Sequence, residues 1–450
     1  MIVMKFGGTS VESAAAIERV AGIVKARLDR QPVVVVSAMG KTTNRLLAIA
    51  SAACNGERDE AARLLEELAA YTLREAGPEV AAFIDEHFQE LAALLDELAG
   101  LGEFPPQYVD LISSYGERLS SRIVAAAFRN FGMDGVHVDA REVIVTDRRY
   151  TQAGPLYSRS YAKLEERVRP LTLAGKVVVV GGFIGSTQDG FTTTLGRGGS
   201  DFSASIVGAG IGAEEIQIWT DVDGMLTCDP RIMPGGHRVR TISFAEAAEL
   251  AYFGAKVLHP ATVVPAVEKN IPVLILNSRN PESEGTRIVA ESVPCANAVK
   301  SIACKRNLVV VNIQSMRMLM AHGFLKRIFD VFDRFQTPVD MVTTSEVSVS
   351  LTIDNTAHLD EICAELRKIA EVTVVDSQSL ICLVGDNIRE TPGLAARVFG
   401  ALRAINVRMI TQGASLLNLS LVVADADLRA AVEALHFEFF TTLDERVFEA

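Results

Sequence analysis

The sequence predicts an α/β domain followed by two smaller ferredoxin-like units, and two observations support this prediction. Short apolar runs such as 33–36 and 177–180 each end in a loop rich in Gly or Ser, which indicates buried strands of an α/β sheet. After about residue 294 the pattern changes to a β-α-β-β-α order that occurs twice. Each occurrence takes roughly 70 residues, which indicates a tandem supersecondary repeat.

Composition indicates a protein of two or three domains with sizeable cores. The 450 residues are 49% hydrophobic and 22% charged, and a domain usually takes about 150 residues. The net charge of −12 argues against a nucleic-acid or anionic-membrane partner. The sequence shows neither an N-terminal signal peptide nor an apolar run of the ~18 residues that a membrane span needs. We therefore expect a cytoplasmic protein.

The cysteines support the same expectation. They are scattered, with no CxxC pair and no Cys/His cluster, which is typical of reduced thiols and makes a zinc site a poor interpretation. The six are Cys54, Cys228, Cys295, Cys304, Cys363 and Cys382.

The first domain, expected over 1–293, alternates strands and helices. Residues 45–101 are rich in Ala, Leu and Glu at helical spacing, and residues 102–106 interrupt this run. The strands are expected at 2–4, 33–36, 136–139, 143–145, 177–180, 216–220 and 271–276, the last of them closing the domain. The helices are expected at 14–29, within 45–101, from 115, at 203–210 and from 244.

The second domain, expected over 300–450, holds the repeat. Its units are expected at about 300–378 and about 379–450, and the two can interleave. The first unit is expected to contain a strand at 308–313, a helix at 324–335, strands at 339–343 and 347–353, and a helix at 359–369. In the second unit the corresponding segments are 380–384, 393–405, 407–412, 419–423 and 428–436. No pattern in the repeat points to catalysis.

The stretch from Val177 to Ile211 carries the clearest signal for a binding site. Its strand ends in Gly181-Gly182-Phe183, and a polar loop closes on Gly196-Arg197-Gly198-Gly199-Ser200-Asp201 before a helix. Glycines let the backbone approach an oxygen closely, and the free N–H groups of a helix start favour negative charge. Arg197 adds a planar fork for a carboxylate or phosphate. The alternative is a tight turn with a solvated Arg197, but three glycines and the preceding run of threonines exceed what a turn requires.

Two further loops follow neighbouring strands. Lys5 ends the first strand before Gly7-Gly8, in neither a P-loop nor a GxGxxG pattern. A lysine in this position suits a phosphoryl-transfer clamp, although the pattern alone fits a solvated lysine equally well. Ser37 to Asn44 forms a hydroxyl-rich loop after the second strand, where ligand crevices of open α/β sheets lie.

Two other residues have open interpretations. Glu117 lies near the expected helix start at 115, so it could complement the helix dipole or bind a ligand amine. His259 precedes a proline between helical segments, and we interpret it as a structural residue at a helix end.

Seven motifs together resemble aspartate kinase (aspartokinase), and VDMVTTSEVSVSLT from Val339 resembles its monofunctional, lysine-sensitive class. The resemblance covers essentially the whole chain, and GRGGSD combined with FGAKVLHP is its most specific part. The motifs are KFGGTS from Lys5, SAMGKTTN from Ser37, YGERLS from Tyr115, TTTLGRGGSD from Thr192, WTDVDG from Trp219, TCDPR from Thr227 and FGAKVLHPAT from Phe253.

The resemblance implies an amino-acid-kinase fold, an open and mostly parallel sheet with helices on both faces, followed by paired ACT domains. It implies ATP-dependent phosphorylation of the L-aspartate side-chain carboxylate to 4-phospho-L-aspartate, the first step toward lysine, threonine and methionine. A carboxylate nucleophile needs no general base, whereas an anion attacking an anion needs cationic clamping of the γ-phosphoryl group. Mg²⁺ would be carried on the nucleotide phosphates and waters, with no protein metal site.

The resemblance also assigns roles to residues at matching positions. The catalytic residues would be Lys5 and Asp201, with Asp201 holding Lys5 in place. Aspartate would be bound by Ser37, Thr43, Glu117, Arg197, Gly198 and Ser200. ATP would be bound by Lys5, Gly7, Gly8, Thr220, Asp221, Thr227, Asp229, Arg231 and Lys256, with N–H groups of Gly7, Gly8, Gly198 and Gly199 facing phosphate oxygens. The allosteric effector would be bound by Met318, Ala321, Phe324, Leu325, Val339, Asp340, Ser345 and Glu346.

Lysine is the expected effector, and a homodimer or dimer of dimers through the ACT units is the expected assembly. The chain departs from the family pattern at Leu226, where relatives often carry an aromatic residue. It also departs at 318–321, where MLMA is more apolar than is usual in lysine-inhibited relatives. Asp340 and Glu346 could alternatively be solvated residues at a strand edge.

Three alternatives to a lysine-regulated aspartate kinase stay open. The chain could be an aspartate kinase that is regulated by another amino acid or that serves a specialised branch. It could phosphorylate glutamate, acetylglutamate or a nucleoside monophosphate. It could also be an inactive ligand sensor, although the presence of Lys5, Arg197 and Asp201 argues against this.

Overall fold

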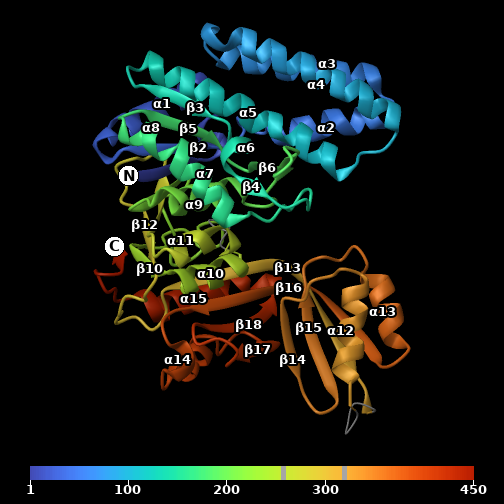
Figure 1. The fold of residues 1–450 in the computed structure, drawn as a ribbon. Coiled ribbons are helices and arrows are strands. Elements are labelled where there is room, and N and C mark those ends of the chain that lie inside the picture. Colours follow the sequence, from blue (N-terminus) through green and yellow to red (C-terminus); the bar gives the residue numbers. More distant parts are fainter. Residues whose placement is uncertain (255–259, 317–321, 450) are drawn as a thin grey trace. The chain divides into compact units, whose positions relative to one another are not determined.

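A computed structural model describes residues 1–254, 260–316 and 322–449 of the chain (Figure 1). The chain divides into two compact units, one made of Met1–Met225 with Val257–Glu291 and the other of Leu226–Lys256 with Ser292–Ala450. The domain boundary near 293–300 and the limits of the ACT units stay predictions.

The first unit is built around a mostly parallel sheet. Neighbouring strands pair in the order β12-β11-β8-β1-β2-β5-β3, and all pairs are parallel except β12 with β11. Because parallel strands end at one edge, the loops that follow β1, β2 and β5 lie together. The strands are β1 (Ile2–Phe6), β2 (Pro32–Val36), β3 (Gly135–Val138), β5 (Val177–Gly181), β8 (Glu215–Thr220), β11 (Val273–Asn277) and β12 (Thr286–Val289).

Helices cover this sheet on both faces. α1 (Ala14–Lys25) packs with α5 (Pro106–Asn130), and α7 (Tyr157–Arg167) packs with α9 (Gly199–Ile211). α9 approaches the sheet closely, since a Cβ added at its Gly208 would lie 2.7 Å from the Ile216 side chain. The shorter helices of the unit are α6 (Ala140–Val143), α8 (Arg169–Leu173) and α11 (Val264–Glu268).

Residues 45–101 are helical, as predicted. α2 (Thr42–Cys54), α3 (Arg58–Glu75) and α4 (Ala81–Leu101) pack on one another beside α5 (Figure 1). The expected helix start at 115 is wrong, because α5 begins at Pro106. A proline in the first turn suits a helix start, and Gly102 ends α4 with φ of +68°.

Four other expectations for this unit need correction. Residues 143–145 do not form one strand, because α6 runs to Val143 and β4 (Val145–Thr146) follows. The polar loop after Phe183 contains a hairpin of β6 (Ile184–Thr187) and β7 (Thr192–Thr194), which β4 joins. Residues 271–276 are not the last strand, since β12 follows β11, and the helix expected at 14–29 ends at Lys25.

The second unit contains a six-stranded antiparallel sheet with the order β14-β15-β13-β16-β18-β17. β13 and β16, 14 residues each, run through both ferredoxin-like halves: β13 pairs with β15 at one end and with β16 along most of its length. The two halves therefore share one sheet through β13 and β16, and interleaving of the ACT units stays a prediction. The strands are β13 (Ser301–Gln314), β14 (Met341–Thr344), β15 (Ser348–Ile353), β16 (Glu371–Val384), β17 (Met409–Gln412) and β18 (Asn418–Ala424).

The helices of the second unit fall where the repeat predicts them. They are α12 (Phe324–Arg334), α13 (Leu359–Arg367), α14 (Leu394–Ala401) and α15 (Leu428–Phe440), and α10 (Phe244–Tyr252) belongs to the same unit. A further pair of short strands, β9 (Arg238–Val239) and β19 (Phe448–Glu449), is antiparallel. All six cysteines are unpaired. Within the described ranges, every helix is too short or too polar to cross a membrane.

Candidate functional site

A cavity of about 300 Å³ lies at the carboxyl ends of β1, β2 and β5. It brings together residues that are far apart in the sequence, including most of those predicted to bind aspartate. Its lining residues are Lys5, Ser37, Thr43, Glu117, Phe183, Gly196, Gly198, Gly199, Ser200 and Asp201. Arg197 lies between two of these residues, and its side chain is exposed.

A lysine–aspartate ion pair joins β1 to the start of α9 within this cavity. The Lys5 ammonium lies 2.7 Å from the Asp201 carboxylate, and the two side chains are 11% and 15% exposed. Asp201 lies in the first turn of α9, where a negative charge also complements the helix dipole. The structure thus agrees with the predicted pairing, and the ammonium is held at the cavity wall.

Glu117 supplies a buried acid to the same cavity. It is 3% exposed in the middle of α5, so the first-turn dipole interpretation is wrong. Its Oε1 atom accepts the Ala38 N–H at 3.0 Å, while its Oε2 atom is buried without a hydrogen-bond partner in the described part of the chain. Burial raises the pKa of Glu117 to about 8. The unpartnered oxygen is therefore suited to a cationic group of a ligand.

The glycines around the ion pair differ in what their backbone can offer. The Gly7 N–H is donated to the Trp219 carbonyl at 3.3 Å, and the Gly199 N–H to the Gly196 carbonyl at 3.0 Å. The expectation that these two N–H groups face phosphate oxygens is therefore wrong here. Gly8 is required for space, because an added Cβ would lie 2.8 Å from two carbonyl oxygens of the 38–40 loop.

Gly198 shapes the start of α9. It is the N-cap residue with φ of +71°, and no side chain caps this helix. An uncapped helix start beside Lys5 provides partial positive charge without a side chain.

The residues predicted to bind ATP are distributed over both units. Thr220 and Asp221 follow β8 in the first unit, with the Thr220 hydroxyl 3.2 Å from the Asp221 carboxylate. Lys256 lies outside the described residues. In the second unit Asp229 forms a 2.6 Å ion pair with Arg231, which is 73% exposed.

The Thr227 side chain makes its contacts within the second unit. The residue is fully buried, and its hydroxyl accepts the His237 N–H and lies 2.9 Å from the His436 ring. The assignment of Thr227 to nucleotide binding stays a prediction.

The described residues among those predicted to bind the effector lie around the start of α12 and the strands β14 and β15. Met318 and Ala321 lie outside the described residues. Phe324 is buried and Leu325 is 40% exposed. Val339 lies just before β14, and the exposed Ser345 and Glu346 lie in the turn after it.

Asp340 is not a solvated edge residue. Its side chain is 8% exposed, and its Oδ1 atom pairs with Lys305 at 2.7 Å. Lys305 also pairs with the more exposed Asp354 at 2.7 Å. The second oxygen of Asp340 is buried and has no hydrogen-bond partner among the residues that the structure describes.

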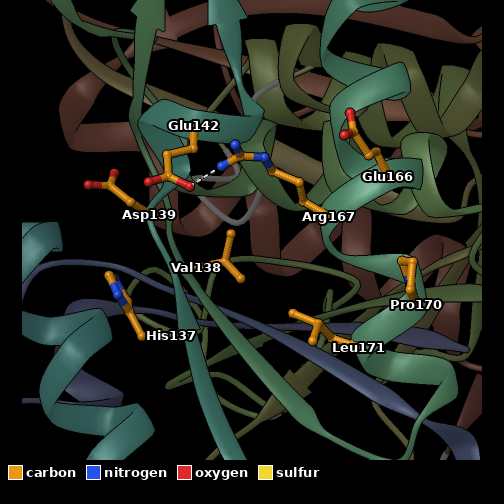
Figure 2. Close-up of a pocket in the computed structure, with 8 residues that line it drawn as sticks. All are labelled: His137, Val138, Asp139, Glu142, Glu166, Arg167, Pro170 and Leu171. Atoms are coloured by element: carbon orange, nitrogen blue, oxygen red, sulfur yellow. Dashed lines mark hydrogen bonds and ion pairs between the residues drawn. The ribbon is translucent and has the colours of Figure 1, made fainter.

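A second hollow, of about 600 Å³, lies near β3, α6, α7 and α8, and its lining residues differ in chemistry from those of the first (Figure 2). Among its described lining residues Arg167 is the one fixed cation, and it is paired with Glu142. Burial lowers the pKa of His137 to about 4, so its ring is neutral at physiological pH. Two further acids, Asp139 and Glu166, make this hollow unsuited to phosphate groups.

Two lining residues of the first cavity, Gly196 and Phe183, were not assigned a role from the sequence. Gly196 belongs to the GRGGSD motif that was recognised. Phe183 has φ of +65°, rare for a bulky residue, and its N–H donates to the Ser203 hydroxyl at 2.9 Å. The preceding glycine pair is the one sequence signal that could have identified it.

Comparisons with known proteins show the family of this chain. Residues 1–277 match the amino acid kinase family, and residues 381–439 match the ACT domain. The chain is 40% identical to aspartokinase 2 of Arabidopsis thaliana, over 98% of this chain and 84% of that protein. It is 36% identical to the lysine-sensitive aspartokinase 3 of Escherichia coli K12, over 98% of this chain and 99% of that protein.

Solved structures lead to the same family. Escherichia coli aspartokinase III in complex with lysine and aspartate aligns with a TM-score of 0.86 and 34% identity, over 98% of this chain and 99% of that one. The complex of the same enzyme with aspartate and ADP aligns with a TM-score of 0.81, over 98% and 100% of the two chains. The chain therefore belongs to the aspartokinases of the amino acid kinase family.

Proposed function

We propose that the cavity around Lys5 is where this aspartokinase transfers the γ-phosphoryl group of ATP to the side-chain carboxylate of L-aspartate. The products are 4-phospho-L-aspartate and ADP. The observation that carries the proposal is the cation and the acid in one cavity: the Lys5–Asp201 pair on one wall and the unpartnered oxygen of Glu117 on another.

The transfer follows from charge. An aspartate carboxylate oxygen attacks the γ-phosphorus, the bond to the β–γ bridging oxygen breaks, and ADP leaves. The nucleophile is already an anion, so no base is needed; the difficulty is the approach of two anions. Lys5, held by Asp201, neutralises charge on the phosphoryl oxygens, and the uncapped start of α9 adds partial positive charge.

Aspartate would be held by its two backbone charges. The ammonium group would lie at the free oxygen of Glu117, and the α-carboxylate would bind Arg197. Ser37, Thr43 and Ser200 would donate hydroxyl hydrogen bonds. Glu117 and Arg197 would then bind the ammonium and α-carboxylate groups of the amino acid. The side-chain carboxylate of aspartate would face the γ-phosphoryl group.

ATP would extend from Lys5 and Gly8 toward Thr220 and Asp221, with Asp229, Arg231 and Lys256 as further predicted contacts. Mg²⁺ would be carried on the nucleotide phosphates with waters, because this ion dehydrates reluctantly and seldom needs a complete protein site. No group of three or more His, Cys, Asp or Glu side chains in the described ranges is placed to hold a metal ion. Lys5 and the start of α9 supply the charge that fits a Mg²⁺-bound triphosphate.

The test is a coupled ADP-release assay with each acceptor in turn. We expect ADP release with L-aspartate and background rates with L-glutamate, N-acetyl-L-glutamate and UMP. Background rates with aspartate, from folded protein at saturating Mg-ATP, would overturn the proposal. A higher rate with another acceptor would reassign the substrate.

Replacing Arg197 by lysine should raise the KM for aspartate about tenfold, because an ammonium cannot reproduce two parallel hydrogen bonds to a carboxylate. The KM for ATP should change less than twofold. Steady-state kinetics with each substrate varied would check this. Arg148→Lys is a suitable control, since Arg148 is an exposed arginine paired with Asp189 in the same unit. A similar rise in both KM values would instead place Arg197 at the phosphates.

Lysine is the effector that we propose, and the ACT units are the proposed contacts of a homodimer. The second oxygen of Asp340, which is buried and does not pair with Lys305, supports a site for an ammonium group, since that oxygen can accept a further hydrogen bond. The similarity to a lysine-sensitive relative supports the same effector. Inhibition would then act through an allosteric coupling of about 1–3 kcal/mol rather than competition at the cavity.

Replacing Asp340 by asparagine should raise the lysine concentration for half-inhibition at least tenfold, because the neutral amide cannot pair with an ammonium. The rate without lysine should stay within about twofold. Asp354→Asn is the matched control: it removes the more exposed acid on the same Lys305 and should leave inhibition nearly intact. If threonine or another amino acid inhibits while millimolar lysine does not, the effector assignment fails but the site can stand.

A further inference from the structure

We infer that Asp110 is a positioning residue that fixes the Arg197-bearing loop in the shape that binds substrate. The inference rests on the proposed function of that loop. Asp110 is fully buried on α5 and is not among the residues that line the cavity, and no motif in the sequence marked it.

The Asp110 carboxylate is saturated with hydrogen bonds from two other segments. Its Oδ1 accepts the Thr194 hydroxyl at 2.6 Å and its Oδ2 accepts the Thr194 N–H at 3.0 Å. The Thr151 N–H lies 3.0 Å from Oδ1 and 2.9 Å from Oδ2. One buried side chain therefore ties the end of β7 to the 147–154 loop.

These two segments directly support the Gly-rich loop. Thr194 ends β7 two positions before Gly196, and the loop residues 196–198 follow at once. A Cβ added at Gly196 would lie 3.1 Å from the Thr151 carbonyl, so the backbone at Thr151 forms the surface on which the loop rests. Thr151 holds a φ of +70°, an uncommon conformation for a threonine, and its N–H faces Asp110.

Both oxygens of the Asp110 side chain must act as hydrogen-bond acceptors. Three donor groups, two N–H and one O–H, converge on the carboxylate, and an asparagine amide would place its own NH₂ against at least one of them. Leaving a buried donor without its acceptor costs more than the hydrogen bond contributed. Burial raises the pKa of Asp110, with these bonds opposing the shift. Asp110→Asn is therefore not a conservative change.

The loop carries Arg197, so a shift of the loop misplaces the guanidinium group. Positioning errors of about an ångström can cost on the order of a hundredfold in rate. Asp110 acts on the substrate only through the loop. Removing its hydrogen bonds should therefore have the same effect on kinetics as changing Arg197 itself, whichever substrate Arg197 binds.

The experiment compares four variants by steady-state kinetics with each substrate varied. Asp110→Asn should raise the KM for aspartate on the order of tenfold and the KM for ATP less than twofold. Thr194→Val, which removes the 2.6 Å hydroxyl hydrogen bond, should raise the KM for aspartate by a smaller factor. Thr194→Ser keeps the hydroxyl and should have a KM for aspartate near the wild-type value. Thr172→Val is the matched control, since its hydroxyl is buried in α8 and bonds the Val168 carbonyl.

A double-mutant cycle separates positioning from general damage. The variant that combines Asp110→Asn with Arg197→Lys should lose little beyond Arg197→Lys alone, because residues acting as a unit are not additive. Full additivity in a folded protein would overturn the inference, and so would an unchanged KM in Asp110→Asn and Thr194→Val. If Arg197→Lys instead raises the KM for ATP, the proposed role of Arg197 in aspartate binding fails. An Asp110→Asn variant that also raises the KM for ATP would still support the positioning role of Asp110. If Asp110→Asn does not fold, Thr194→Val and Thr194→Ser decide.

Discussion

Replacing Lys5 by alanine is expected to lower kcat about a hundredfold or more while changing the KM for ATP much less. The reason is that its ammonium stabilises charge that develops on the phosphoryl oxygens during transfer, and removing one such donor typically costs a factor of this size. The structure holds the ammonium in place through Asp201 at 2.7 Å, so little reorganisation is needed at the moment of reaction. Single-turnover measurement of phosphoryl transfer at saturating Mg-ATP and aspartate would check the prediction.

Two further variants sharpen the result for Lys5. Asp201→Asn keeps the shape but removes the charge that holds Lys5, so we expect a smaller loss of kcat. Lys176→Ala is the control, because Lys176 makes an exposed 3.5 Å ion pair in the same unit. A folded Lys5→Ala protein with a wild-type kcat would contradict the assignment of Lys5 to the phosphoryl group.

The buried strands could be predicted because each is a continuous apolar run. Residues 33–36 and 177–180 show no alternation of apolar and polar residues, because helices cover both faces of the sheet. These residues are completely or almost completely buried in the structure. The errors fall where long-range contacts decide. The threonines of β7 looked like loop residues because they are polar, yet Thr194 is bound by Asp110 across 84 positions of the chain.

The sequence predicts which residues form the candidate site better than it predicts their positions in the fold. Motifs identified nine of the residues in and around the cavity. Glu117 nevertheless appeared to lie at a helix start, because the prolines at 105 and 106 looked like a break. Pro106 instead begins α5, which places Glu117 mid-helix. Its burial depends on packing, since a Cβ at Gly116 would lie 2.7 Å from the Ala38 side chain.

Ion pairs between distant strands were beyond sequence reasoning. Asp340 was expected to face a ligand, and the structure shows that one of its oxygens is already paired with Lys305. Nothing in the local sequence links these positions, because the contact follows from the register of β13, β14 and β15. The apolar segment 318–321 gave no indication of it either.

Replacing Glu117 by glutamine is expected to raise the KM for aspartate roughly 30-fold or more, with the KM for ATP nearly unchanged. Removing one partner of a buried charge pair costs about 2–5 kcal/mol, and about 1.4 kcal/mol corresponds to a factor of ten. Glutamine keeps the volume and can still accept the Ala38 N–H, so the fold should persist. Glu90→Gln is the matched control, because it makes the same change on an acid whose side chain is 46% exposed.

The pH dependence tests the same carboxyl group independently. Burial raises the pKa of Glu117 to about 8, so the carboxyl group is mostly protonated at neutral pH. It must lose its proton before an ammonium group can pair with it. The kcat/KM for aspartate should therefore fall as pH drops below about 8, approaching tenfold per pH unit, and should level off above it. The kcat/KM for ATP should show no such slope at saturating aspartate, because the bound ammonium keeps the carboxylate ionised. Glu117→Gln should remove the slope, and a wild-type profile that is flat between pH 6 and 8 would mean that another group binds the ammonium.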